Sequence, residues 1–364
     1  PGYVDPHTHV KCNTYGLAEC MEKGREFIRW DEKRREYENQ TGPVRKGIGM
    51  AIFCYKTGVY PISLETASCR MILNQDGSMQ LQMGATEIGQ GADTVFTQMA
   101  AEVTGITEDK VNVLSTQDTD VSPFDTGAYA SRQTYVSGMA VKKTGAIFKE
   151  KILDYAAYML EKPQDTLDVR DNHIVDKETG TQLLPMEELA TTAFYSLDRS
   201  VHITAEATSH CKTNTFATGA CFAEVEVDMP LGKVKVTNIV NVHDSGKLIN
   251  PKLAAAQVHG GMSMGLGYGL SEELLFDAKG RPLNDNLLDY KLPTAMDTPD
   301  LNALFVELDD PTGPFGNKAL GEPPAIPVAP AVRNAVLNAT GVAVDSLPMD
   351  PQKMVKHFKE AGLI

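Results

Sequence analysis

The chain has 364 residues, of which 42% are hydrophobic and 23% are charged, and its formal net charge is −14. No uninterrupted apolar run is long enough to cross a bilayer, so composition predicts a soluble globular chain with room for two domains and no membrane partner. The acidic balance, without a stripe of Lys and Arg, argues against a nucleic-acid partner. Six scattered cysteines without a CxxC pair argue against a zinc or iron–sulfur site in this chain and favour a reducing cytoplasm.

The first residues, Pro1-Gly2-Tyr3-Val4-Asp5-Pro6, contain no initiator Met and no signal-peptide regions, and they are typical of a linker. The chain is therefore expected to be a piece of a longer polypeptide or a processed one. Apolar residues at 3/4 spacing predict a helix over about 17–37. Strands at 68–73 and 78–83 flank an Asp76-Gly77 turn, which predicts a hairpin.

The rest of the chain mixes hairpins and helices without regular βαβ alternation, which predicts an α+β fold in two lobes. We expect residues 1–43 to form an N-terminal linker and helix, 44–199 a first lobe and 200–364 a second lobe. The remaining expected elements are a helix near 94–104, a strand at 111–116, a long helix from about 133 to 160, an aperiodic domain junction at 162–199, strands at 220–228 and 233–242, a Gly-rich helix at 253–270, a strand at 302–308, and helices at 325–339 and 351–361.

Two loops of small residues each open a predicted helix. The loop 84–94 contains Gly89-Gln90-Gly91 and is expected to leave backbone amides free for an anionic or polar ligand. It lacks the Lys-Ser/Thr of a P-loop, so spacing alone favours a plain N-cap loop. The loop 122–133 places Ser131 and Arg132 at the mouth of the long helix, where an Arg fork suits phosphate oxygens. An N-cap serine beside an exposed arginine is an equal alternative.

The segment 255–269 carries five glycines, each costing a helix roughly 1 kcal/mol relative to alanine. Close packing against a neighbouring element would explain them, and so would access of a bulky cofactor to Gln257. His259 has no second ligand at metal spacing and is expected to be an ordinary polar residue.

Near the C-terminus, Glu322 stands between Gly321 and Pro323-Pro324. A carboxylate with its backbone restricted on both sides could act as a positioned general base. Taken alone, the same residues favour the plainer interpretation of a helix start.

Together, the four segments resemble the molybdenum-binding subunit of the xanthine dehydrogenase family of molybdenum hydroxylases, especially the bacterial enzymes in which that subunit is a separate chain. The likeness runs over nearly the whole sequence, from Gly16-Leu17-Ala18-Glu19-Cys20 to Ala361-Gly362-Leu363-Ile364. The phrases that carry it are Gly84 to Asp93, Ser115 to Asp120, Asn241 to Gly246, Gln257 to Gly261 and Leu320 to Pro324.

The resemblance implies a molybdenum–molybdopterin cofactor, in the cytosine dinucleotide form by the bacterial pattern, with no direct protein ligand to the metal. Glu322 matches the family's catalytic base, which takes a proton from the attacking water-derived oxygen. Tyr60 falls near the family's ring-sandwiching aromatics and is a candidate substrate contact. The residues that match cofactor contacts are Gly89, Gln90, Gly91, Ala130, Ser131, Arg132, Gln133 and Gln257.

Two further family segments, GGxFG and RGYG, are absent from the sequence. The resemblance therefore implies the C-terminal half of the subunit, with the N-terminal half as a partner. Electrons would pass to [2Fe-2S] and FAD groups on an Fe–S subunit and an FAD subunit, and on to NAD. The expected reaction is hydroxylation of a purine, xanthine or hypoxanthine. The alternatives are a hydroxylase acting on nicotinate, another N-heterocycle, an aldehyde or an aromatic CoA thioester, or a fragment with no activity of its own.

Overall fold

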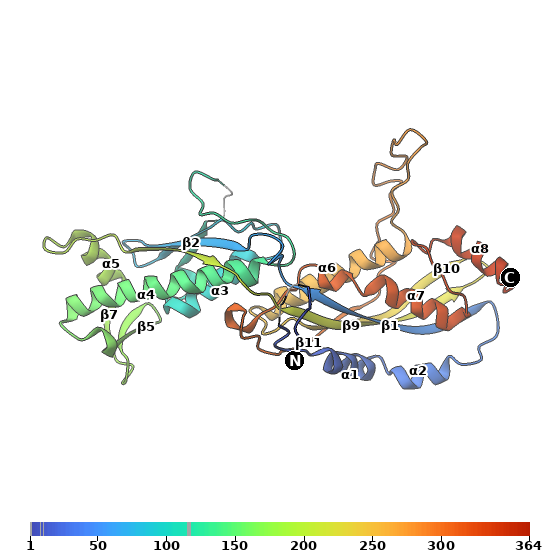
Figure 1. Ribbon diagram of the computed structural model, residues 1–364, viewed down its shortest axis with the longest axis horizontal. Coiled ribbons are helices and arrows are strands. Elements are labelled where there is room, and N and C mark those ends of the chain that lie inside the picture. Colours follow the sequence, from blue (N-terminus) through green and yellow to red (C-terminus); the bar gives the residue numbers. More distant parts are fainter. Residues whose placement is uncertain (1, 8, 10, 115–117) are drawn as a thin grey trace.

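The computed structural model describes residues 2–7, 9, 11–114 and 118–364. The expected α+β fold is confirmed: two lobes lie one after the other along the long axis of the molecule (Figure 1), and each is built on its own four-stranded sheet. Residues 115–117 of the family-like phrase 115–120 lie outside the described part of the chain. Among the described residues, no helix is long and apolar enough to cross a membrane.

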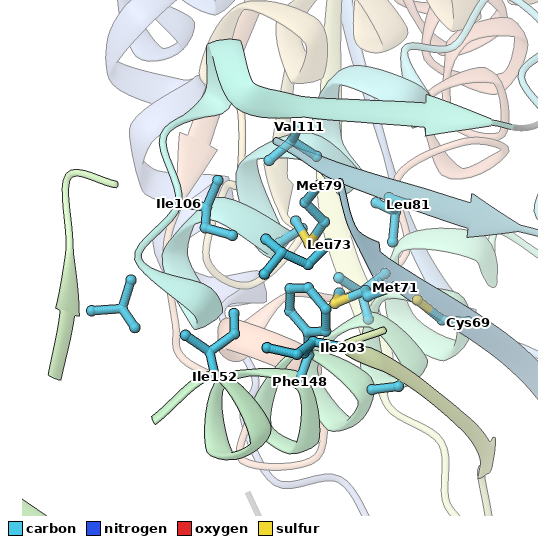
Figure 2. Packing of buried hydrophobic residues seen from close by; sticks show 14 of the residues in the cluster. Cys69, Met71, Leu73, Met79, Leu81, Ile106, Val111, Phe148, Ile152 and Ile203 are labelled. Carbon is cyan, nitrogen blue, oxygen red and sulfur yellow. The ribbon is translucent and has the colours of Figure 1, made fainter. Parts of the chain in front are cut away.

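The first lobe has the strand order β4-β3-β2-β8, with helices α3 and α4 against the sheet. The expected hairpin is confirmed as the β2–β3 pair. Methionine and leucine side chains of the sheet pack against Phe148 of α4 and bury the core of this lobe (Figure 2). The elements are β2 (Thr66–Leu73), β3 (Met79–Met83), α3 (Ala92–Thr104), β4 (Val111–Leu114), a π-helical turn η2 (Gln133–Ser137), α4 (Gly138–Leu160) and β8 (Thr204–His210).

Residues 162–199 are not the aperiodic junction that the sequence predicts. They form a three-stranded antiparallel sheet and a helix at the outer end of the first lobe. Strands of four residues are too short to show a periodic pattern. Val169, Ile174 and Leu189 are nevertheless buried in the same core as Phe148. The elements are η3 (Gln164–Thr166), β5 (Leu167–Arg170), β6 (His173–Asp176), β7 (Gln182–Pro185) and α5 (Met186–Tyr195).

The second lobe has the strand order β1-β9-β10-β11, in which only the β10–β11 pair is parallel. Helices α6 and α7 pack on one face of this sheet and α1 on the other. Gly47 and Gly49 of β1 let α7 approach, because a Cβ at either would lie 2.1 Å from the backbone of Ala335. The elements are β1 (Val44–Lys56), β9 (Phe216–Asp228), β10 (Lys233–Asp244), α6 (Pro251–Leu270), β11 (Leu301–Val306), η4 (Pro314–Gly316), η5 (Pro323–Ala325), α7 (Val328–Thr340) and α8 (Pro351–Glu360).

The sheets do not follow the expected boundaries after residues 43 and 199. Strand β1 lies in the expected first lobe by sequence, yet it pairs along its length with β9. Strand β8 lies in the expected second lobe, yet it pairs with β2. The chain therefore crosses between the lobes twice. Pairing between strands more than 130 residues apart leaves no mark on local sequence patterns.

The single helix expected over 17–37 is two helices, α1 (Leu17–Phe27) and α2 (Trp30–Glu36). The break lies at Arg29, which adopts a left-handed conformation with φ 59°. The α1 helix packs tightly on the sheet, since a Cβ at Gly24 would lie 2.4 Å from the ring of Phe222. A short 3-10 turn, η1 (Glu108–Lys110), precedes β4.

Candidate functional site

A cavity of about 360 Å³ is lined by residues from both lobes. It brings together most of the residues that the sequence analysis singled out, although they come from four separate segments of the chain. Gly89 and Ala130 adjoin lining residues in the chain without lining the cavity themselves, and Tyr60 is not among the lining residues. The expected site residues that line the cavity are Gln90, Gly91, Ser131, Arg132, Gln133, Gln257 and Glu322.

Glu322 is held through one carboxylate oxygen. Its Oε2 accepts hydrogen bonds from the hydroxyls of Tyr55 and Ser131, both at 2.5 Å. Its backbone N–H in turn donates to Oγ of Ser131 at 2.9 Å. Among the described residues nothing bonds to Oε1. The carboxylate is therefore oriented by two hydroxyls and keeps one oxygen available.

Tyr55, which donates to Glu322, was not among the site residues that the sequence analysis predicted. The strand that carries it, β1, was not predicted either. Burial raises the pKa of Tyr55, and its hydrogen bond to Glu322 raises it further. The phenol therefore stays protonated at neutral pH and donates to the carboxylate.

Ser131 reaches Glu322 from a strained piece of backbone. Ala130 and Ser131 both have left-handed conformations, with φ 47° and 49°. Such a conformation costs a residue other than glycine roughly 1–2 kcal/mol, so the surrounding structure must hold it in place. One support is the N–H of Gly58, which donates to the carbonyl of Ala130 at 2.9 Å.

Arg132 is the main support of this loop. Its guanidinium, 0% exposed, donates to Glu65 at 2.5 Å and to Asp125 at 2.6 Å. It also donates to the carbonyls of Gly127 at 2.8 Å and Thr66 at 2.9 Å. The expected phosphate fork is therefore wrong for this side chain, because two buried carboxylates already use its charge and most of its donors. The alternative of an exposed arginine is wrong too.

The backbone N–H groups of the loop before α3 are also hydrogen-bonded within the protein. The carboxylate of Glu87 accepts from the N–H groups of Gly89 at 2.6 Å, Gly91 at 3.2 Å and Asp93 at 3.1 Å. Burial alone would raise the pKa of Glu87, but these backbone donors outweigh burial and lower it. The amides expected to be free for an anionic ligand are thus occupied, and the plainer interpretation of a capped helix start describes this loop.

Gln90 and Gln133 link the two loops. The Gln90 amide donates to Gln133 Oε1 at 2.6 Å and to the carbonyl of Thr86 at 2.8 Å. Gln133 donates to the same carbonyl at 3.1 Å. The two glutamines expected to meet a cofactor therefore also bind each other.

On the second-lobe side of the cavity, several polar side chains make no hydrogen bonds within the described part of the chain. Ser245 and Asn317 are only 3% and 2% exposed, and their side-chain polar atoms have no hydrogen-bond partner among the described residues. The side chain of Gln257 makes no hydrogen bond there either, and Lys247 has no ion pair. Behind them, Lys318 and Asp244 form a fully buried ion pair at 2.7 Å. Buried polar groups without partners are rare, so these point to a polar ligand in the cavity.

The glycines of α6 are explained mainly by close packing. A Cβ at Gly261 would lie 2.4 Å from Pro324, and one at Gly265 would lie 2.6 Å from Val328. A Cβ at Gly267 would lie 1.8 Å from the carboxylate of Glu272, and one at Gly269 would make a tight contact of 3.2 Å with Ala329. Packing of α6 against η5 also sets Gln257 beside the Glu322 loop. Only Gly260 has open space around it, with nothing within 4 Å.

Residues 23–299 match the model of the molybdopterin cofactor-binding domain family. The chain is 48% identical to the xanthine dehydrogenase molybdenum-binding subunit of Escherichia coli O157:H7, covering 100% of this chain and 48% of that protein. It is 28% identical to the carbon monoxide dehydrogenase large chain of Hydrogenophaga pseudoflava, over 91% of this chain and 43% of that one. Quinoline 2-oxidoreductase from Pseudomonas putida 86 shares the fold, with a TM-score of 0.89 at 23% identity over 99% of this chain and 48% of its own.

The chain therefore belongs to the molybdopterin cofactor-binding domain family. It spans about half the length of the relatives that it matches.

The sequence analysis missed several residues of the site. Ser245 lies inside the family-like phrase Asn241 to Gly246, and Asn317 lies three residues before the phrase Leu320 to Pro324, but the sequence analysis gave neither residue a role. Glu65 and Asp125, which hold Arg132, had no local signal. Among the described residues, no cluster of three or more His, Cys, Asp or Glu could hold a metal ion.

Proposed function

We propose that this chain forms the C-terminal half of a molybdenum hydroxylase subunit and that Glu322 is its catalytic base. The observation that carries the proposal is the convergence on one cavity of Glu322 with residues from the segments 90–91, 131–133 and 245–257. A pocket of this kind, with a few convergent polar groups, is where a cofactor and substrate are bound in most enzymes.

The cavity fits a polar cofactor such as molybdopterin. Ser245 Oγ and the Asn317 amide offer buried donors and acceptors that no other described residue pairs with. With Gln257, they would hold the cofactor from the second lobe, while Gln90, Gln133 and Ser131 would meet it from the first. Gly89, Gly91, Ala130 and Arg132 would act by shaping the loops. When bound, the cofactor supplies a two-electron redox centre. We include the cytosine dinucleotide form in the proposal.

The residues of this chain supply the proton chemistry. Oε2 of Glu322 is occupied by Tyr55 and Ser131, so a proton would be accepted at Oε1. The two hydroxyl donors hold the carboxylate in one direction, as a positioned general base requires. Tyr55 and Ser131 are positioning residues in this scheme, since they act through Glu322.

The proposed substrate is a purine, xanthine or hypoxanthine, since a relative that is 48% identical to this chain is named as a xanthine dehydrogenase subunit. Related hydroxylases acting on nicotinate, another N-heterocycle or an aldehyde remain the alternatives. Tyr60 stays a proposed substrate contact, although it does not line the cavity. The proposed partners are the N-terminal half of the molybdenum subunit, an Fe–S subunit and an FAD subunit that passes electrons to NAD, in the cytoplasm. Alone, the chain is expected to be inactive.

Glu322→Gln in the complete enzyme tests the base. We expect turnover of xanthine to fall by about 10²–10⁴-fold with the molybdenum content unchanged, because the amide cannot accept the proton. Xanthine oxidation with an artificial electron acceptor measures the first quantity and elemental analysis the second. Glu360→Gln, at an exposed position of α8, is the control and should leave both unchanged. Near-normal turnover in Glu322→Gln would exclude this role.

A further inference from the structure

His243 on β10 is a buried ionisable residue that the proposed function does not use. Its side chain is 0% exposed, and neither ring nitrogen has a hydrogen-bond partner among the described residues. Burial lowers the pKa of His243 to about 3, so the imidazole is neutral at neutral pH. A neutral imidazole has one N–H donor and one acceptor nitrogen, and leaving both unpaired in the interior is costly. We therefore expect each nitrogen to have a partner in the folded protein.

The residues directly opposite His243 on the neighbouring strands have no polar side chains. These residues are Gly219 on β9 and Phe305 on β11. Phe53 on β1 lies opposite Gly219, and its ring reaches the imidazole at a centroid distance of 4.9 Å. The ring of Phe305 lies 6.4 Å from the imidazole. Partners for the ring nitrogens must therefore come from along β10 or from the layer that packs on it.

Polar side chains do lie along the chain on either side of His243. Asn241 and Ser245 are two residues before and two residues after it, the spacing that places side chains on one face of a strand. The Asn241 amide donates to the carbonyl of Pro324 at 2.9 Å, so this face is turned toward η5. Asn241 Oδ1 and Ser245 Oγ are buried and have no hydrogen-bond partner among the described residues. We call Ser245, His243 and Asn241 the polar row.

The polar row begins at the cavity and ends behind the turn that carries Glu322. Ser245 lines the cavity, and its hydroxyl can bind both a ligand there and a group behind it. Side chains two residues apart on a strand are about 7 Å apart, which suits one bridging water between polar groups. Buried waters typically occupy such positions. Ile239, the next residue on this face, belongs to the apolar core, so the row ends at Asn241.

We propose that the polar row binds a chain of ordered waters that supports the Glu322 turn from behind. The inference rests on the proposed function, because it assigns His243 and Asn241 as positioning residues for the base. The two prolines after Glu322 have no N–H to donate, so few backbone hydrogen bonds can hold this turn. The bond from the Asn241 amide to the turn is correspondingly important. Waters that pair with Asn241 Oδ1 fix the direction of that amide.

A high-resolution crystal structure of the complete enzyme tests the waters directly. We expect ordered waters within about 2.7–3.2 Å of both ring nitrogens of His243 and of Asn241 Oδ1. His243→Gln keeps a donor and an acceptor and should keep the waters. His243→Phe offers neither and should lose the waters beside residue 243. A His243 ring that contacts only protein atoms in the unchanged enzyme would overturn the proposal.

The kinetics of the same variants test the positioning role. His243→Phe and Asn241→Leu should each lower kcat for xanthine by about tenfold with KM unchanged, because a shifted turn misplaces the base without removing a substrate contact. His243→Gln should keep kcat within about twofold of the unchanged enzyme. Molybdenum analysis should give the same content in all three variants, which separates misplacement of the base from loss of the cofactor.

Thr218→Val is the matched control, since it removes a buried hydroxyl that also has no hydrogen-bond partner among the described residues. Thr218 lies opposite Asp244, whose carboxylate accepts from the N–H of Gly16 just before α1. It therefore lies on the other face of the sheet. The waters of the polar row and kcat should both be unchanged in this variant.

Unchanged kcat in both His243→Phe and Asn241→Leu would overturn the positioning role. An equal loss in His243→Gln and His243→Phe would also overturn it, because the imidazole itself would then be needed. Glu322→Gln should keep the waters. Near-normal turnover of Glu322→Gln with the waters in place would overturn the proposed function and leave the water site standing, whereas missing waters with turnover lost in Glu322→Gln would overturn this inference alone.

Discussion

The two sides of the cavity differ in how their polar groups are used. On the first-lobe side, Glu87, Arg132 and the pair Gln90 and Gln133 bond within the protein. On the second-lobe side, the buried side chains of Ser245 and Asn317 have no hydrogen-bond partner in the described part of the chain. Satisfied buried networks set geometry, whereas an unpaired buried group is costly unless a ligand pairs with it. The first-lobe side is therefore a rigid support for Ser131 and Glu322, and the second-lobe side is where a ligand gains most.

The largest effect is expected on the supporting side, from Arg132→Met. It leaves Glu65 and Asp125 buried without their cation, which should destabilise the chain by about 3–5 kcal/mol. Denaturant unfolding of the chain measures this loss. Arg70→Met is the control, since the ion pair of Arg70 with Glu206 lies near the surface and its loss should cost less than about 1 kcal/mol. An equal loss in the free energy of unfolding in the two variants would contradict the idea that Arg132 supports the site more than a surface arginine does.

On the second-lobe side, Asn317→Leu should not destabilise the chain, in contrast to Arg132→Met. It removes an unpaired buried amide, so the free energy of unfolding should stay the same or rise by about 1 kcal/mol. Cofactor content in the complete enzyme should fall, as measured by molybdenum and pterin analysis. Asn338→Leu is the matched control, because Asn338 Oδ1 accepts from Ile48 N–H at 3.0 Å and its loss should destabilise by about 1 kcal/mol. Destabilisation by Asn317→Leu would show that its amide is satisfied.

Glu87→Gln tests the loop before α3 and should have the smallest effect, about 1 kcal/mol at neutral pH, as for loss of a helix cap. The pKa of Glu87 is lowered in the folded chain, so the stabilisation is fully present above its unfolded pKa and is lost as pH falls through the folded value. Unfolding curves of the two forms should therefore converge in acid. Glu102→Gln, exposed on α3, should show no such pH dependence. If the difference in unfolding free energy between the unchanged chain and Glu87→Gln did not depend on pH, the Glu87 carboxylate would be excluded as the helix cap.

Local patterns predicted the local elements well. The β2–β3 hairpin, α3, the strands β9 and β10, and α6 follow from turn residues and periodicity within one segment. The patterns failed at β1, at β8 and at 162–199, where pairing with distant strands or a shared core decides the structure. The same limit applies to Arg132: its neighbours in the chain are compatible with a phosphate fork, but Glu65, 67 residues away, takes its charge.

The sequence by itself determined the family of this chain, the α+β class and the segments that supply Glu322, Gln257 and Ser131, because these depend on short runs of residues. Tertiary structure alone decided which polar groups remain available in the cavity. A hydrogen bond between groups such as Tyr55 and Glu322, 267 residues apart, exists only once β1 and η5 are packed together. For the same reason, the side chains of Ser245 and Asn317 that have no partner among the described residues become visible only in the folded chain.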